Sequence, residues 1–480
     1  MNARARAFEL LPSSILATAA ILGVVAALQP VIAVGVVGGL VLAYVTFSDL
    51  ALGFAVLAFL SFVDTLPTSG SLSPAKAAGL LVAVAWLARF SIGERGRSER
   101  DFFAEHSYLT WTLVAFFGWA TLSLLWAPST SASFGALQRY APNLLLIPIG
   151  YTAVRTRRDL AIVVGAIVLG AMVAAAFAVL QPPNPNIVEE SQRATGTIGD
   201  PNELAAVLLV GLALGAGYAL GRTRLPLLRL IAAIAVPLCA AGIFLSLSRG
   251  GLVALAALML AGTVFAGRWR MAITLMLTVI AAGGFIYYTQ LAPLPARERV
   301  SSAKGGTGRT DLWTVGWREV QAHPITGVGV GNFPNTSAEY TLRPGLIQRT
   351  DLIFNERPYV THNTYLQIMA ETGVPGLLLF LGVIGACLRW TLLAARIWAR
   401  RGQVAMEALA RSMFLGLCGM LVADFFISVM YSKLLWVLLA LGPAMYAIAS
   451  REDTAETAID EPDPDESFIE RSRSLAAPAY

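Results

Sequence analysis

Long apolar runs joined by short connections dominate this chain of 480 residues. Each run is about 17–20 residues long, enough for an α-helix to cross a hydrocarbon core of roughly 30 Å. Backbone groups inside lipid need internal hydrogen-bond partners, so runs of this length are expected to be helices. The composition agrees, because 56% of the residues are hydrophobic and only 14% are charged. The sequence therefore predicts an all-α, polytopic membrane helix bundle.

About 12–14 transmembrane helices are expected, because the first two runs and the sixth are short or weakly separated. The expected spans are 11–28, 30–47, 50–66, 74–91, 108–127, 140–153, 159–180, 202–220, 227–246, 251–267, 270–289, 366–395, 410–430 and 433–450. This pattern divides the chain into N-terminal transmembrane helices (1–289), one large loop (290–361), C-terminal transmembrane helices (362–450) and an acidic tail (451–480).

The placement of arginines predicts which side of the membrane each loop occupies. With the N-terminus inside, the inner loops hold most of the loop arginines and the short outer loops hold few. The loop 290–361 is then outside and the tail inside. The tail is acidic and nearly devoid of bulky apolar residues, so we expect it to be disordered. No basic patch with interleaved aromatic residues points to nucleic acid.

Two outer loops carry structural signals. Loop 181–201 ends in Asp200-Pro201-Asn202-Glu203, where Asp or Asn can cap a helix that has proline at its first position. In loop 290–361 a short amphipathic helix is expected from Thr310 to Ala322. Its aromatic stripe predicts a place on the membrane surface or over the bundle. The stripe comprises Leu312, Trp313, Gly316, Trp317 and Val320.

Two arginines on the outer side are candidates for ligand binding. Arg249 follows Ser248 between two apolar runs, and an arginine at membrane depth costs roughly 2.5–3.5 kcal/mol at the bilayer centre. Its structural alternative is a side chain that extends to the interface. Arg309 precedes the loop helix, and its alternative is a solvated loop residue. Guanidinium groups bind phosphate oxygens in a bidentate manner, which makes both arginines candidates for a diphosphate.

The segment His362-Asn363 closes the large loop and opens a hydrophobic run, so it lies where water meets lipid. A neutral imidazole there can accept a proton from a sugar hydroxyl near neutral pH. The alternative is a structural histidine at a helix start. Two arginines and one neutral base together suit attack on the sugar carbon of a lipid-diphosphate sugar. No histidine pair or cysteine cluster suggests a metal or other cofactor, so none is expected.

Two further acidic residues have open roles. Asp424 lies within a late expected span, where it either pairs with Lys433 or a bundle arginine or belongs to a proton or substrate path. Glu371 is expected to orient the helix that follows His362.

Five pieces in order resemble the O-antigen ligase/polymerase superfamily of bacterial envelope glycosyltransferases, over about residues 190–395. They are Arg193-Ala194-Thr195-Gly196-Thr197 with Asp200-Pro201-Asn202, then Ser248-Arg249-Gly250-Gly251, Gly308-Arg309-Thr310-Asp311-Leu312-Trp313, His323-Pro324-Ile325-Thr326-Gly327-Val328-Gly329, and His362-Asn363 through Glu371-Thr372-Gly373.

The resemblance implies a metal-independent, inverting transfer of a glycan from an undecaprenyl-diphosphate carrier to a lipid or glycan acceptor. It places the protein in the bacterial inner membrane with its site facing the periplasm, where other envelope polysaccharide assembly proteins are possible partners. Arg249 and Arg309 would bind the diphosphate and His362 would be the base. Arg193 and Asn202 would belong to another outer-loop motif, and Asn363 to the substrate site.

Three alternatives remain open at this point. Ligase and polymerase share the donor site, and no short motif separates them. A transporter of a glycolipid or of a small anion such as bicarbonate also fits many spans together with Asp424. A non-catalytic scaffold that docks partners through its tail is the third alternative.

Overall fold

The structure, a computed structural model, describes residues 29–63, 73–92, 102–181, 193–221, 226–301, 309–341 and 360–460. Every regular element among these residues is a helix, so the predicted all-α class is confirmed. The first expected span, 11–28, lies outside the described residues.

The N-terminal helices bury their apolar residues in one large shared core. Their bounds are α2 Pro30–Ser48, α3 Leu50–Leu60, α4 Pro74–Ile92, α5 Phe102–Glu105, α6 Ser107–Leu122, α7 Thr130–Ala153, α8 Arg157–Leu180, α9 Pro201–Leu220, α10 Pro226–Leu245, α11 Arg249–Phe265 and α12 Arg270–Ile286. The expected span 140–153 is the second part of the longer α7, which contains Pro142 and Pro148.

The described residues of the large loop form three helices, where the sequence predicts one. The bounds of these three and of the later helices are α13 Leu294–Ser301, α14 Arg309–Ala322, α15 Phe333–Thr341, α17 Thr364–Arg400, α18 Val404–Ala423 and α19 Lys433–Asp460. The expected loop helix is α14, one residue longer than predicted, and it ends just before Pro324.

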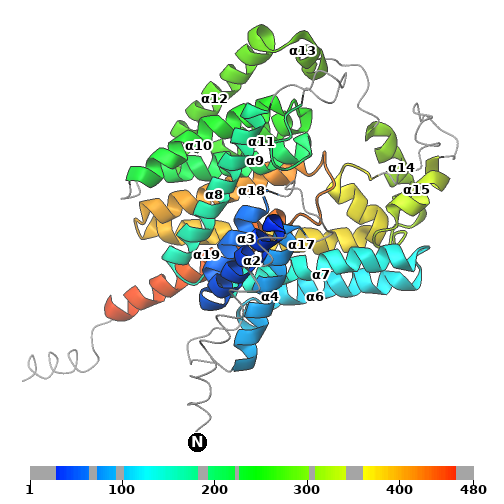
Figure 1. Cartoon of the computed structure of the whole chain (residues 1–480), viewed down its shortest axis with the longest axis horizontal. Helices are drawn as coiled ribbons and strands as arrows, with labels where there is room; N and C mark the ends of the chain where they lie inside the picture. The colour runs from blue at the N-terminus through cyan, green and yellow to red at the C-terminus, as the bar shows by residue number, and fades with distance from the viewer. Residues whose placement is uncertain are drawn as a thin grey trace, which may run out of the picture.

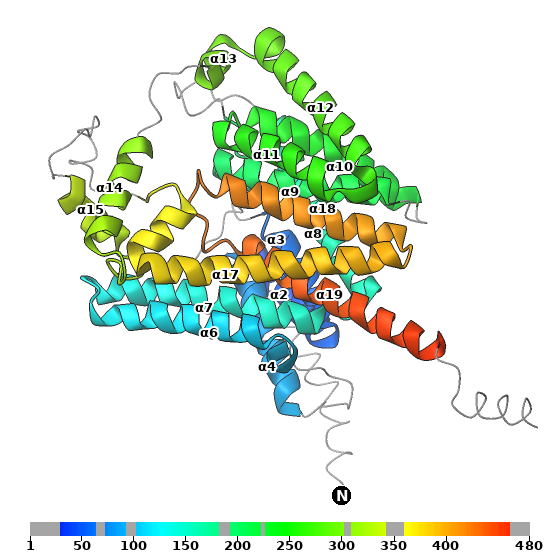
Figure 2. The same cartoon turned by 180° about the vertical axis from the view of Figure 1, so that it is seen from behind.

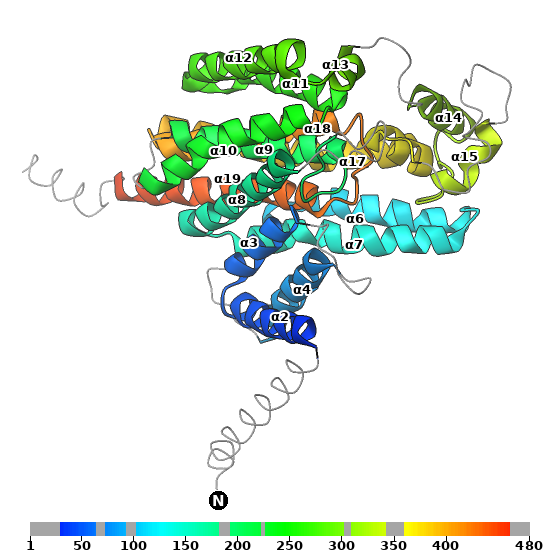
Figure 3. The same ribbon diagram turned by 45° about the horizontal axis from the view of Figure 1, so that its top comes forward.

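The helices are stacked in layers. Figure 3 separates α11 and α12 at the top of the view from α2 and α4 at the bottom, with α9, α10, α18 and α19 between them. In Figure 1, α14 and α15 lie at the side of the bundle, away from α8 and α10. The helix α9 packs against both α10 and α18 and is almost entirely buried.

Hydrogen bonds join several loops at one end of the bundle. The amide of Ala194, before α9, donates to the carbonyl of Leu245 at the end of α10, at 3.0 Å. The amide of Thr364, at the start of α17, donates to the carbonyl of Asp424 after α18, at 2.9 Å. These contacts gather the outer loops expected from the sequence at a single end, which we call the loop end.

Ion pairs join the loops at the opposite end. Arg157, at the start of α8, pairs with Glu452 of α19, and Arg268 pairs with Glu407 of α18 at 2.8 Å. Helices α8 to α12 and α17 to α19 therefore run back and forth between two ends. Arg157, Arg268 and Arg411, three of the arginines expected on the inner side, lie at this second end.

Seven helices among the described residues are long and apolar enough to cross a membrane. They are Ser107–Leu125, Arg157–Leu180, Pro201–Leu220, Gly267–Leu291, Thr364–Arg400, Val404–Ala423 and Lys433–Asp453. Four shorter apolar helices accompany them, including Arg249–Phe265. A multi-pass membrane protein follows from these lengths and compositions.

Helix α19 continues to Asp460, into the segment 451–480 that the sequence predicts to be disordered. Glu452 holds this extension in place. Its carboxylate pairs with Arg157 and accepts a hydrogen bond from Trp398 Nε1 at 3.0 Å. These partners come from α8 and α17, and the acidic composition of the tail gives no sign of them. Residues 461–480 lie outside the described part of the chain.

A break in α17 seats the large loop against the bundle. Gly373 has φ 70° and ψ −178°, a conformation that is essentially restricted to glycine. The turn that follows α14 crosses this break, where the amide of Gly329 donates to the carbonyl of Glu371 and the amide of Val374 to that of Pro324. Figure 2 shows the short first part of α17 at an angle to its long second part.

Replacing Gly373 by alanine is expected to destabilise the fold. The new Cβ would lie 2.0 Å from the carbonyl oxygen of Ile325, in addition to a backbone cost of about 1–3 kcal/mol. We expect a thermal unfolding temperature in detergent that is several degrees lower, together with a low folded yield. Gly385→Ala in the same helix is the control, because a Cβ there meets nothing within 4 Å. Equal stability of the two variants would contradict this account of the break.

Candidate functional site

A cavity of about 190 Å³ lies at the loop end of the bundle, where three helices begin. Asn202 comes from the first turn of α9, Arg249 and Gly250 from the start of α11, and Arg309 and Thr310 from the start of α14. The N-terminus of a helix carries partial positive charge, so three such ends around one cavity favour an anion.

The wall formed by α9 and α11 is braced by hydrogen bonds. The side chain of Asp200 caps α9, which confirms the predicted cap with proline at the first position. Asn202 Oδ1 accepts a hydrogen bond from Arg193 Nη2 at 2.8 Å and one from the Ser248 hydroxyl at 2.9 Å. Arg193 Nε also donates to the carbonyl of Ser246 at 3.0 Å. Arg193 and Asn202 therefore line the cavity and hold the segment that presents Arg249.

The cavity gathers positive charge from separate segments. Arg249, Arg299 and Arg309 all line it, together with Arg193. Burial lowers the pKa of Arg309, with Asp200 raising it and the positive charges of Arg249 and Arg299 lowering it further. Arginine stays protonated in proteins, so the mutual repulsion remains as a local excess of positive charge that an anion would neutralise. Arg299 was not singled out from the sequence, because it lies among other charged residues of α13.

Aromatic side chains form the apolar part of the wall. Trp313 of α14 and Phe426, which follows α18, lie with ring centroids 6.3 Å apart. A Cβ added to Gly250 would come within 2.7 Å of Phe426, so glycine lets this ring approach α11 closely. Trp313 Nε1 donates to the carbonyl of Thr361 at 3.1 Å, which ties the loop helix to the segment before α17. The aromatic stripe thus packs over the bundle, although Trp317 is exposed.

His362 lies beside the cavity in a restrained backbone position. It has φ 52°, in the left-handed region that residues other than glycine adopt rarely. Its neighbours are fixed on both sides, since the Thr361 hydroxyl donates to the carbonyl of Asn363 at 2.8 Å. Asn363 Oδ1 accepts hydrogen bonds from the amides of Tyr365 and Leu366 and so caps α17. This strain is of the kind that is found at functional sites.

The charge state of His362 suits proton acceptance. Burial lowers the pKa of its imidazole below the usual 6.5, and the charge of Arg309 lowers it further, whereas Asp200 raises it. The ring is therefore mostly neutral at pH 7. His362 is not among the residues that line the cavity itself, but it interacts electrostatically with Arg309 in its wall.

The other candidates have structural contacts. The side-chain oxygen of Asn363 is used by the helix cap, and Asn363 does not line the cavity. Glu371 orients its surroundings as expected, because its carboxylate accepts from the amide of Gly331 at 2.7 Å and from Gln367 Nε2 at 3.1 Å. Asp424 follows the end of α18 and is buried. Its expected pairing with Lys433 or an arginine is not present among the described residues.

The remaining two histidines are held away from the cavity. The ring of His106 is buried between aromatic rings, with centroids 5.1 Å from Tyr151 and 5.0 Å from Trp390. His323 Nε2 lies 3.1 Å from the hydroxyl of Tyr340 in the large loop. Of the three histidines, His362 is the one that interacts electrostatically with Arg309 in the wall of the arginine cavity.

A family model matches part of the chain. Residues 234–381 match the family model Wzy_C, described as O-antigen ligase. No curated protein matches the chain. Arg193 and Asn202 precede the matched segment, whereas α11, α14 and the start of α17 lie within it. The chain is therefore a multi-pass membrane protein whose residues 234–381 are similar to the O-antigen ligase family, and this segment contains Arg249, Arg309 and His362.

Proposed function

We propose that this protein transfers a glycan from an undecaprenyl-diphosphate carrier to a hydroxyl of a lipid or glycan acceptor. The observation that carries the proposal is the meeting of Arg249, Arg299 and Arg309 with three helix N-termini, beside a neutral His362. Guanidinium groups bind the two phosphates and leave the apolar carrier in the membrane. The match to the O-antigen ligase family supports the same substrate class.

The reaction is an inverting displacement at the anomeric carbon. The acceptor oxygen forms the new bond to that carbon while its proton passes to His362, which acts as general base. The bond from the anomeric carbon to the diphosphate oxygen breaks, and its electron pair leaves with undecaprenyl diphosphate. The arginines neutralise the charge that grows on the leaving group, so the departing oxygen needs no proton. The step requires no metal ion and takes place on the periplasmic side of the inner membrane.

The lipids that accumulate in a deletion strain test this function. A ligase moves completed glycan to an acceptor lipid, so its loss leaves polymer on the carrier. A polymerase extends the glycan, so its loss leaves single repeat units on the carrier. Mass spectrometry of polyprenyl-linked glycans would distinguish the two outcomes. A carrier pool unchanged from that of the parent strain would contradict both forms of the proposal.

Membrane vesicles that contain the purified protein test the alternative function, transport. Vesicles that contain only this protein are expected to convert the donor lipid to product on one face without moving it across the membrane. Uptake of labelled bicarbonate or of the glycolipid by such vesicles, without glycan transfer, would overturn the proposal in favour of transport.

A further inference from the structure

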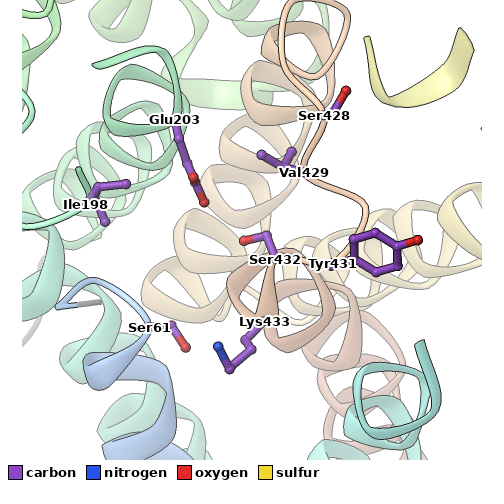
Figure 4. A pocket seen from close by; sticks show the side chains of 8 residues that line it. All are labelled: Ser61, Ile198, Glu203, Ser428, Val429, Tyr431, Ser432 and Lys433. Atoms are coloured by element: carbon purple, nitrogen blue, oxygen red, sulfur yellow. The ribbon is translucent and has the colours of Figure 1, made fainter. Parts of the chain in front are cut away.

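A second cavity, about 210 Å³ in volume, lies at the loop end of the bundle. Most of its polar lining comes from separate helices: Ser61 follows α3, Glu203 is in the first turn of α9, and Lys433 begins α19. Ser428 and Ser432 come from the segment between α18 and α19. Figure 4 shows Glu203, Ser432 and Lys433 directed into one common space, with the amine of Lys433 reaching toward Ser61.

We infer that this cavity is the acceptor subsite and binds the hydroxyl groups of a sugar. Its charges are mixed, with one carboxylate, one ammonium group and several hydroxyls around it. A carboxylate accepts hydrogen bonds from sugar hydroxyls, and an ammonium group donates to their oxygens. The opposite charges of Glu203 and Lys433 leave little net attraction for a free anion or a free cation, whereas a neutral polyol can donate a hydrogen bond to the carboxylate and accept one from the ammonium group. The inference rests on the proposed function.

The second cavity shares two walls with the arginine cavity. Consecutive residues of α9 face the two spaces, since Asn202 lines the arginine cavity and Glu203 the second one. The segment after α18 does the same, with Phe426 in the first cavity and Ser428 in the second. The two cavities are thus neighbours, separated by the first turn of α9 and by the segment that follows α18.

The histidine base is attached to one of these shared walls. The hydroxyl of Thr361 lies 3.4 Å from that of Ser428, and the Thr364 hydroxyl donates to the carbonyl of Ile427 at 2.7 Å. His362 lies between these two attachments in the chain. An inverting displacement needs the acceptor oxygen and the leaving group on opposite faces of the sugar carbon. Two neighbouring cavities that share lining segments, with a base attached to one of these segments, suit this requirement.

The test compares acceptor dependence with donor binding. Purified protein in phospholipid vesicles receives carrier-linked glycan from the deletion strain and, as acceptor probe, increasing amounts of the unmodified glycolipid fraction from the same strain. In Glu203→Gln and in Lys433→Gln we expect the half-saturating amount of acceptor fraction to rise about tenfold or more, the effect of losing a hydrogen bond to a charged group. Binding of radiolabelled undecaprenyl diphosphate should stay within about twofold of wild type.

Glu339→Gln, which removes an exposed carboxylate from α15, is the control and should leave both measurements unchanged. The two polar replacements keep nearly the same side-chain size, and donor binding reports that each variant is folded. An unchanged acceptor dependence in variants that still bind the donor overturns the subsite assignment while leaving the transferase proposal intact. A wild-type protein that forms no product from this donor and acceptor overturns the proposed function itself.

Discussion

His362→Ala is expected to lower the rate of glycan transfer by about 10²–10⁴-fold, the usual contribution of a general base. The acceptor hydroxyl would then have to lose its proton to water during attack on the sugar carbon. Donor binding should be retained, because Arg249, Arg299 and Arg309 line the diphosphate cavity without the imidazole. The measurement is product formation in vesicles, together with glycan output in cells that lack the native gene.

Because His362 has a left-handed backbone conformation, its replacement by alanine could also disturb the backbone, and a second variant is needed as a control. Asparagine tolerates φ 52° better than alanine does, so His362→Asn separates a conformational role from proton transfer. Both variants should be inactive and folded, while His323→Ala should transfer glycan normally. If His362→Asn restores full output, the imidazole is not the base.

The pH profile gives an independent readout of the same residue. Because burial and Arg309 lower the pKa of His362, the imidazole remains mostly neutral until the pH falls below the usual 6.5. The acid limb of kcat/KM for wild-type protein is therefore expected below pH 6.5, with activity lost as the ring gains a proton. A limb above pH 6.5 would contradict the environment described for the ring.

The sequence predicts much of this fold, because membrane helices are encoded locally. A run of apolar residues requires a helix whatever lies next to it, and the loop helix of 310–322 was found from its own periodicity and the following proline. The break at Gly373 was not predicted, since it depends on the carbonyl of Ile325 in a distant loop. The extension of α19 likewise depends on partners of Glu452 in other helices.

For the residues around the arginine cavity too, the sequence shows local patterns but not contacts between distant segments. Arg249, Arg309 and His362 were selected by residue type, by expected depth and by resemblance to a family, and the fold brings them together. Arg299 carries the same charge into the cavity but has no local pattern that separates it from its charged neighbours. Asn363 was assigned to the substrate site as part of the resemblance to a family, whereas its side-chain oxygen caps α17. A motif shows which residues occur together but not which atoms each side chain contacts.

Arg309→Lys and Arg249→Lys are expected to weaken donor binding by about 10–100-fold each. Lysine keeps the positive charge but loses the planar fork that holds phosphate oxygens by two hydrogen bonds. Loss of one hydrogen bond to a charged group costs about 1.5–3 kcal/mol, which corresponds to this range of affinity. Radiolabelled undecaprenyl diphosphate binding to protein in detergent micelles is the measurement, and transfer at saturating donor should fall less than affinity does.

Arg318→Lys supplies a matched control within α14. Its guanidinium donates to the carbonyl of Tyr340 at 2.8 Å and does not line the arginine cavity. Donor affinity should therefore be close to that of wild type in this variant. Because lysine keeps the positive charge, a rise in salt should weaken donor binding to a similar extent in wild type and in the two cavity variants. Wild-type affinity in both Arg249→Lys and Arg309→Lys would show that the cavity does not hold the diphosphate, and the proposed transfer would lose its leaving-group site.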